Sequence, residues 1–407
     1  MNANAAFLHG LERALGRPSE ATRRAGLVRW FDRWFDADGL ATGCAPADWF
    51  AALESIAARG SIDESFGDRA EDVRASLEQL LRRTRPDGRL FYTAAATNRD
   101  AATRWEALAR WAKSTSCESV LRQWRPRAFA GVLMPPPLPS WHEEFVVDSV
   151  IREDWEREGV WAGIEHRTPG TSSRFEMGID GRPVFGPTWR SPAPDPEASE
   201  TRRGPRASVV AARSGPTGDL VEWTHSLAGT RRSRTVVMVR GRELALFAEQ
   251  VDGPGERGFE IGLDEDWKLA AGPEGPMQRL TRTARGRGIA ILNPGSPRGC
   301  RLSCEPGRLI VRDDGPGPRR WPAIVVCWGP VPTECVPLTV SERSRICPDH
   351  VAVAFRLGWG SRAEGILVYR SLARPGLRAV LGLQTRARFA VGRIDRGRVL
   401  PLVTIDR

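Results

Sequence analysis

The spacing of hydrophobic residues changes partway along this chain of 407 residues, and that change limits the possible folds most strongly. Up to about residue 130, apolar residues recur every three to four positions, as they do on one face of an α-helix. After about residue 140, apolar and polar residues alternate in short runs, such as 234–239 and 243–248, which is typical of strands. The sequence therefore predicts a helical part followed by a β part.

A proline-rich segment separates the two parts. Residues 134–140 read Met-Pro-Pro-Pro-Leu-Pro-Ser, and proline cannot continue a helix because it lacks a backbone N–H. We therefore predict an α+β protein with its domain boundary in this segment. Residues 1–134 are expected to form antiparallel helical hairpins, and residues 135–407 a large antiparallel β-sandwich.

The chain is strongly basic, and the charge comes from arginine. The formal net charge is +10, and all but two of the 60 basic residues are arginine. Between Thr201 and Arg242, nine arginines stand against two acidic residues, which leaves a local net charge of +7. Such an excess attracts polyanions, although a solvated strand face and an arginine-rich genome are alternative explanations. Nucleic acid is disfavoured as the partner because no helix-turn-helix, RNP or zinc-finger spacing is present.

Several common chemistries are disfavoured because their motifs are missing. We find no G-x-G-x-x-G before a helix, no Walker A sequence, no G-x-S-x-G and no H-E-x-x-H, so nucleotide-dependent enzymes, serine hydrolases and zincins do not fit. Seven cysteines without a C-x-x-C pair predict free thiols. No cofactor and no metal are expected.

The chain also lacks obvious targeting signals. No apolar run reaches the ~18 residues of a membrane span, and residues 1–16 have neither the basic nor the apolar region of a secretory signal. We therefore expect a cytoplasmic protein without a membrane partner, and leave export by another route open.

One segment carries a family resemblance. Val221-Glu-Trp-Thr-His225 is followed by arginine-rich residues 231–252, which end in Asp252. This arrangement resembles the heparinase II/III-like polysaccharide lyases, which combine an α/α toroid with a C-terminal β super-sandwich. The resemblance covers about residues 140–407 and implies a super-sandwich preceded by a partial, toroid-like helical domain.

The resemblance implies a carbohydrate-associated protein whose partner is an acidic polysaccharide, either uronate-containing or sulfated. Because the helical part is too short for a full toroid, the first hypothesis is a catalytically degenerate binding protein. Two alternatives remain open. One is an active lyase that cleaves uronic-acid glycans by β-elimination, and the other is a non-catalytic scaffold that binds another protein.

β-Elimination needs a group that neutralises the uronate carboxylate, a base for the α-proton and an acid for the leaving oxygen. The chain has two tyrosines and five histidines, so few residues qualify. Our catalytic candidates are Tyr92, after an Asp-Gly turn, His142, after the proline segment, and His225, just before the arginine cluster. A structural role is the alternative for each.

Substrate-binding candidates surround His225. An aromatic ring beside guanidinium groups suits an acidic sugar, since arginine binds carboxylate or sulfate with two parallel hydrogen bonds. The candidates are Trp223, Arg231, Arg232, Arg234, His166 and Trp161. Trp155, Trp161 and Trp189 lie among charged residues or glycines and are the tryptophans best suited to an exposed platform for sugar rings. Packing in a core is the alternative for the tryptophans.

Overall fold

The computed structural model describes most of the chain. The described residues are 3–36, 40–41, 44–92, 101–125, 135–142, 148–165, 172–191, 207–227, 230–253, 257–270, 277–282, 288–294, 300–315, 317–360, 364–374 and 376–406. The chain divides into two compact units. The helical unit takes in Met1–Pro139, Arg152–Trp161 and Asp180–Arg182, and the β unit takes in Ser140–Ile151, Ala162–Ile179 and Pro183–Arg407.

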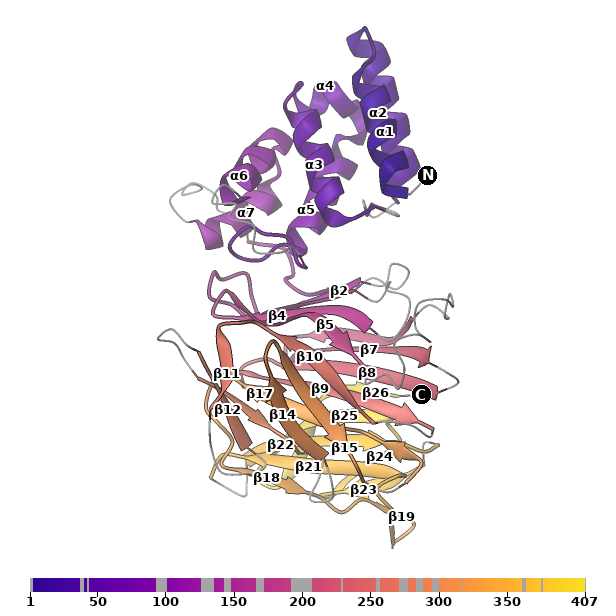
Figure 1. The fold of residues 1–407 in the computed structure, drawn as a ribbon, viewed down its shortest axis with the longest axis vertical. Helices are drawn as coiled ribbons and strands as arrows, with labels where there is room; N and C mark the ends of the chain where they lie inside the picture. The colour runs from indigo at the N-terminus through magenta and orange to yellow at the C-terminus, as the bar shows by residue number, and fades with distance from the viewer. Residues whose placement is uncertain are drawn as a thin grey trace. The chain divides into compact units, whose positions relative to one another are not determined.

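The helical unit contains short helices (Figure 1). The helices are α1 (Ala3–Leu15), α2 (Glu20–Trp34), α3 (Pro46–Ala57), α4 (Ile62–Phe66), the 3-10 turn η1 (Gly67–Arg69), α5 (Ala70–Arg82), α6 (Ala101–Ala112) and α7 (Thr115–Trp124). Local sequence explains where several of them begin. Ser19 and Ser61 each cap a helix through a capping box, and Pro46 occupies the first turn of α3. Among the described residues, no helix is both long enough and apolar enough to span a membrane.

The strands form four sheets. All strand neighbours in the nine-, five- and four-stranded sheets pair antiparallel, and so do four of the pairs in the eight-stranded sheet. The eight-stranded sheet runs in the order β1 (Trp141–His142), β2 (Asp148–Arg152), β3 (Trp161–Glu165), β4 (Ser172–Ile179), β5 (Arg182–Arg190), β10 (Gly258–Leu263), β15 (Arg308–Asp313), β14 (Cys300–Glu305). The nine-stranded sheet runs in the order β11 (Trp267–Leu269), β12 (Met277–Arg282), β13 (Ile289–Leu292), β17 (Ala323–Cys327), β9 (Leu244–Asp252), β8 (Thr230–Val239), β7 (Gly218–Leu227), β6 (Ser208–Gly215), with β16 (Arg319–Arg320) beside β9.

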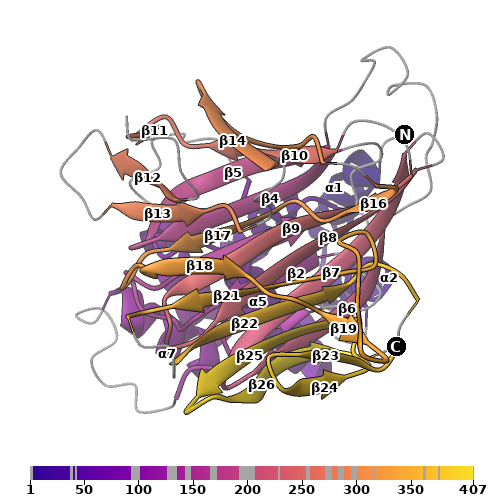
Figure 2. The ribbon, with the colours of Figure 1, turned by 90° about the horizontal axis from the view of Figure 1, so that it is seen from below.

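Two smaller sheets come from the C-terminal part of the chain. The five-stranded sheet has the order β18 (Glu334–Pro337), β21 (Ala352–Gly358), β22 (Glu364–Ser371), β25 (Phe389–Asp395), β26 (Arg398–Ile405). Figure 2 shows its long strands side by side. The four-stranded sheet has the order β20 (Arg345–Ile346), β19 (Ser341–Glu342), β23 (Arg378–Val380), β24 (Leu383–Thr385). The predicted helical part followed by a large antiparallel super-sandwich is therefore confirmed.

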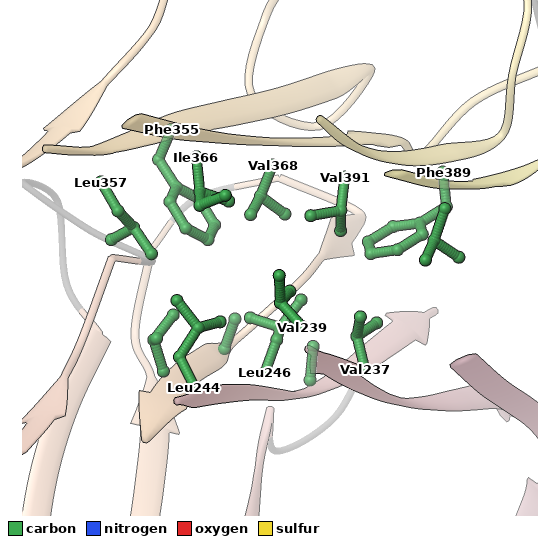
Figure 3. Packing of buried hydrophobic residues seen from close by; sticks show 14 of the residues in the cluster. Val237, Val239, Leu244, Leu246, Phe355, Leu357, Ile366, Val368, Phe389 and Val391 are labelled. Carbon is green, nitrogen blue, oxygen red and sulfur yellow. The ribbon is translucent and has the colours of Figure 1, made fainter. Parts of the chain in front are cut away.

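The nine-stranded sheet is the middle layer, because side chains pack against both of its faces. On one face, the ring of Phe247 lies 5.2 Å from that of Phe175 in β4 and 5.7 Å from that of Phe185 in β5. On the other face, a hydrophobic cluster joins β8 and β9 to the five-stranded sheet (Figure 3). The labelled members of this cluster are Val237, Val239, Leu244, Leu246, Phe355, Leu357, Ile366, Val368, Phe389 and Val391.

Burial on both faces restricts which side chains β8 and β9 can contain, because neither strand has a face in solvent along its buried part. Successive residues of a strand point to opposite faces, yet all of β8 from Arg232 to Val239 is buried, and so is all of β9 except Asp252. The alternative of a solvated strand face for Arg232 and Arg234 is therefore wrong, since neither face of β8 meets solvent at these positions.

Candidate functional site

Strands β7, β8 and β9 bring most of the predicted site residues together. In the antiparallel register, Trp223 lies opposite Arg234, and His225 lies opposite Arg232. Arg234 in turn lies opposite Glu249. Directly opposed residues point to the same side of a sheet, so all five side chains lie on one face. It is the face that packs on the eight-stranded sheet, because Phe247, two positions from Glu249, contacts β4 and β5.

The core of this group is an ion cluster around one carboxylate, which we call the Glu249 cluster: Glu249, Arg232, Arg234, Ser173 and Ser191. Arg232 Nη1 lies 2.6 Å from Glu249 Oε1, and Arg234 Nε lies 2.9 Å from Oε2. Arg234 also donates to the hydroxyls of Ser173 and Ser191, at 2.8 and 2.9 Å. Each of these residues is buried. The two arginines predicted to face a ligand therefore neutralise a carboxylate inside the sandwich, where an unpaired charge is very costly.

The cluster also determines the protonation of its neighbour His225. Burial, together with the charges of Arg234 and Arg232, lowers the pKa of His225 to about 3. Burial alone would raise the pKa of Glu249, but the two guanidinium groups outweigh it and lower that pKa. At neutral pH, Glu249 is thus ionised and His225 is neutral. Among the described residues, neither ring nitrogen of His225 has a hydrogen-bond partner. A neutral imidazole with such a low pKa is a poor proton donor at neutral pH.

The opposite face of the same strands carries a second group, which we call the Glu222 cluster: Glu222, Gln250, Arg370, Arg388 and Arg231. Arg370 Nη1 lies 2.6 Å from Glu222 Oε2, and Arg370 Nη2 lies 3.1 Å from Oε1, which is a bidentate pair. Arg370 Nε also donates to Gln250 Oε1 at 3.0 Å. Arg388 Nη2 lies 2.9 Å from Glu222 Oε1.

The Glu222 cluster differs from the Glu249 cluster because it reaches solvent. Arg370 and Glu222 are buried, whereas the side chain of Arg388 is 24% exposed and Arg231 is exposed. Burial lowers the pKa of Arg388, Glu222 opposes this, and the like charges of Arg370 and Arg231 lower it further. The cluster therefore presents two guanidinium groups at a surface with more positive than negative charge.

The other histidine candidates lie elsewhere. His142 is on β1, where burial lowers its pKa and the charge of Asp219 opposes that effect. Asp219 is fully buried and accepts hydrogen bonds from Arg240 at 3.1 and 3.2 Å. Because Asp219 and His225 are six residues apart on β7, they are roughly 20 Å apart along the strand. The structure thus does not bring His142 and His225 together. His166 lies outside the described residues.

Tyr92 and Trp161 belong to the helical unit. Tyr92 is partly buried and has a φ of 62°, in the left-handed region that a residue with a bulky side chain rarely adopts. Its neighbour Phe91 stacks on Trp161 with ring centroids 5.0 Å apart. The guanidinium of Arg85 lies 6.0 Å from the centroid of the Trp161 ring. Tyr92 therefore adjoins an aromatic and arginine-rich cluster.

The expectation of an exposed tryptophan platform is wrong. Trp155, Trp161 and Trp189 are 3%, 0% and 0% exposed. Each packs against rings or cations: Trp161 stacks on Phe91, and Trp189 lies 5.6 Å from Trp223. Trp223, a predicted sugar-stacking residue, is fully buried as well and donates its ring N–H to Ser173 at 3.2 Å. Core packing, the alternative considered for the tryptophans, accounts for all four.

Sequence reasoning missed one buried charged residue in each cluster, Glu249 in the first and Arg370 in the second. Glu249 and Arg370 are charged residues inside apolar runs, Leu-Ala-Leu-Phe-Ala-Glu and Ile-Leu-Val-Tyr-Arg. A charge within such a run signals a buried partner, because unpaired buried charges are avoided. That signal could have identified both residues, although not their partners. Among the described residues, no group of three or more His, Cys, Asp or Glu side chains could hold a metal ion.

Comparison with known proteins defines the fold. No family model matches the sequence, and no curated protein matches it. Solved structures do match: heparan sulfate lyase HepC from Pedobacter heparinus has a TM-score of 0.58 at 14% identity, over 94% of this chain and 65% of that one. A gene product described as heparinase III has a TM-score of 0.61 at 12% identity, over 97% and 65%. A further heparinase III structure has a TM-score of 0.56 at 13% identity, over 97% and 66%.

The chain therefore has the heparinase-like lyase fold that its sequence predicted. It spans about two thirds of the length of the lyases that it matches, 65 to 66%. The likeness extends over both the helical and the β part, since it covers 94 to 97% of this chain. At 12 to 14% identity the likeness shows the fold alone.

We predict that Glu249→Gln destabilises the protein strongly. The substitution leaves Arg232 and Arg234 buried without a carboxylate, and breaking a buried ion pair in this way costs about 3–5 kcal/mol. Urea unfolding followed by tryptophan fluorescence measures the loss. Glu305→Gln is the matched control, because its carboxylate is 46% exposed and pairs with Arg308 on the surface, where a pair contributes about 1 kcal/mol or less. Equal losses in the two variants would contradict the assignment.

We also predict that His225 makes the protein less stable in acid. Its pKa is about 3 in the folded state, against 6.5 for an unperturbed histidine. Between these values the unfolded chain binds a proton and the folded protein does not, so the free energy of unfolding falls by up to about 1.4 kcal/mol for each pH unit of acidification. In His225→Gln this dependence should be flatter between pH 6.5 and 4.5 than in the wild type or in His9→Gln. An unchanged slope would show that His225 is protonated in the folded protein.

Proposed function

We propose that the protein binds acidic polysaccharide through the solvent-facing arginines of the Glu222 cluster. The observation that carries this proposal is the charge balance of the cluster. Arg370 and Arg388 both pair with the single carboxylate of Glu222, and the charge of Arg231 acts on Arg388, so the group has a net charge of +2. Nearby Asp252 is matched by Arg319 and does not change the balance.

The geometry suits a carboxylate or sulfate group. Arg370 is held by Glu222 and Gln250 in the interior, and it keeps Glu222 from neutralising Arg388 completely. The exposed guanidinium of Arg231 offers planar N–H donors toward solvent, and such donors bind oxyanions with two parallel hydrogen bonds. Nε and Nη2 of Arg388 are buried, so Arg388 contributes mainly its charge. Repulsion between the two guanidinium groups falls when an anion binds between them.

Two further observations support a polysaccharide partner. The chain has the fold of proteins that are named heparan sulfate lyase and heparinase III, and its own net charge is +10. A positive field raises the rate at which a polyanion associates. Fold likeness alone does not establish a function, so the arginine geometry is the feature to test.

We predict that Arg231→Ala weakens binding to heparin about threefold at low ionic strength, and that Arg231→Glu weakens it more. Arg231 is exposed, so the effect is that of one screened surface charge, and it should fade as salt is added. Affinity chromatography over a salt gradient, followed by calorimetry, measures both effects. Arg301→Ala removes the same charge from a side chain that is 80% exposed on β14 and serves as the control. Equal effects of the two substitutions would reject the proposed surface.

A second candidate function is polysaccharide cleavage, which the backbone of Tyr92 favours. Residues held in sparsely populated backbone regions cluster at active sites, because the surrounding structure must stabilise the strain. Tyr92, with a φ of 62°, is such a residue, and its phenol could act as the acid or base of β-elimination. His225 is poorly suited to the acid role because it is buried and neutral.

The binding proposal predicts no cleavage. Incubation with a panel of uronate polysaccharides should give no rise in ultraviolet absorbance from a new carbon–carbon double bond. If absorbance does rise, the lyase candidate predicts that Tyr92→Phe abolishes the signal and Tyr369→Phe does not. Tyr369, the other tyrosine of the chain, is fully buried and serves as the control.

A further inference from the structure

A pocket in the helical unit gathers three arginines that form no ion pair with any described residue. It has a volume of about 170 Å³ and lies where the end of α1, the start of α2 and the residues after α3 meet. Its charged lining residues are Arg23, Arg24, Arg59, Glu20 and Glu64. The volume far exceeds the roughly 15 Å³ that one ordered water needs, so the pocket can hold a small ion together with water.

The three arginines differ from several other arginines of the helical unit. Arg69, Arg74, Arg82 and Arg104 each lie within 4 Å of a carboxylate. Within the described part of the helical unit, Arg23, Arg24 and Arg59 form no ion pair. Arg59 instead donates to the backbone carbonyl of Leu15 at 3.3 Å, which holds its guanidinium at the C-terminal end of α1.

The guanidinium of Arg24 occupies space that is left free by the missing side chain of Gly67. Its guanidinium lies directly against Gly67, and a Cβ at that position would overlap the guanidinium group. Gly67 also has a φ of 55°, a conformation that side chains other than glycine rarely adopt. Both features leave room for the guanidinium of Arg24 against the backbone at Gly67, and Arg24 also lines the pocket.

The acidic lining residues do not cancel this charge. The backbone N–H of Ser61 donates to Glu64 Oε2 at 2.9 Å, and this bond lowers the pKa of Glu64. Glu64 is thereby oriented toward the first turn of α4, which it caps. Glu20 is exposed in the first turn of α2, where the helix dipole favours a negative charge. The three arginines and the two glutamates, Glu20 and Glu64, together give the pocket a net charge of +1.

We infer that this pocket binds a tetrahedral oxyanion of the sulfate type. Guanidinium groups at its wall supply planar donors for the oxygen atoms, and the bound charge would lower the repulsion between adjacent Arg23 and Arg24. The oxyanion can be free in solution or can be a sulfate group on a glycan chain. Only the second source rests on the proposed function.

The experiment uses inorganic sulfate as the probe and the full chain as the protein. Melting temperature is followed over low millimolar sulfate at constant ionic strength, with chloride as the reference salt. The wild type should show a saturable rise, because a ligand that binds only the folded state stabilises it. Arg23→Ala/Arg24→Ala should weaken the apparent affinity about tenfold or more, whereas Arg13→Ala/Arg33→Ala, which removes the same charge from the same helices, should leave it unchanged.

A second variant covers the case in which the double substitution fails to fold. Glu20→Gln removes a negative charge from an exposed position and should tighten sulfate binding about twofold. A wild type without a saturable rise, or equal responses of the two double variants, would overturn the inference, and so would weaker binding by Glu20→Gln.

A competition experiment with glycans distinguishes the two sources of the oxyanion. If the sulfate is carried by a glycan, a sulfated glycan should compete with inorganic sulfate for this pocket and a desulfated glycan should not. Arg301→Ala removes an exposed charge from β14 and touches neither site, so its sulfate response should match the wild type. A saturable sulfate response without any glycan binding would thus support the pocket while rejecting the proposed function.

Discussion

The burial of strands β7 to β9 between two other sheets is the constraint on which the β unit depends. A middle layer has no solvent-facing side, so each charged side chain on it needs a partner inside the protein. Glu249 satisfies Arg232 and Arg234 on one face, and Glu222 satisfies Arg370 on the other. At one end of this layer Arg231 of β8 reaches water, and Arg388, whose charge it influences, is partly exposed.

Much of the fold follows from local sequence, and much of the site does not. The change of hydrophobic period identified the helical and β parts, because period reflects which face is buried. The number of layers depends instead on distant segments: Glu222 and Arg370 are 148 residues apart, and no local pattern pairs them. The apolar run Val236–Val239 is typical of a strand that is buried on both faces, and it could have argued against exposed arginines beside it.

The tryptophans also show that local sequence does not predict which side chains are covered by distant segments. Charged and glycine neighbours made Trp155 and Trp189 candidates for an exposed surface, yet rings from other strands and helices cover them. The residues next to a tryptophan in the sequence do not determine its burial. Side chains from other strands and helices that pack over it do. The resemblance to a lyase family supplied the fold correctly because it rested on the order of strands. It placed the catalytic candidates less well, because His142 and His225 are held in separate surroundings.

The pairing of Glu249 with Arg234 across adjacent strands has a consequence for how the sandwich assembles. Side chains alternate between faces, so sliding β8 by one residue against β9 would exchange its two sides. Glu249 would then lose both of its cations, and both guanidinium groups would move to the face that already carries Arg370 and Arg388. A strand that is apolar on both faces would tolerate such a shift, but a misaligned β8 would leave the carboxylate of Glu249 buried without a cation. The Glu249 cluster thus favours the native register of β8 against β9 over a shifted one.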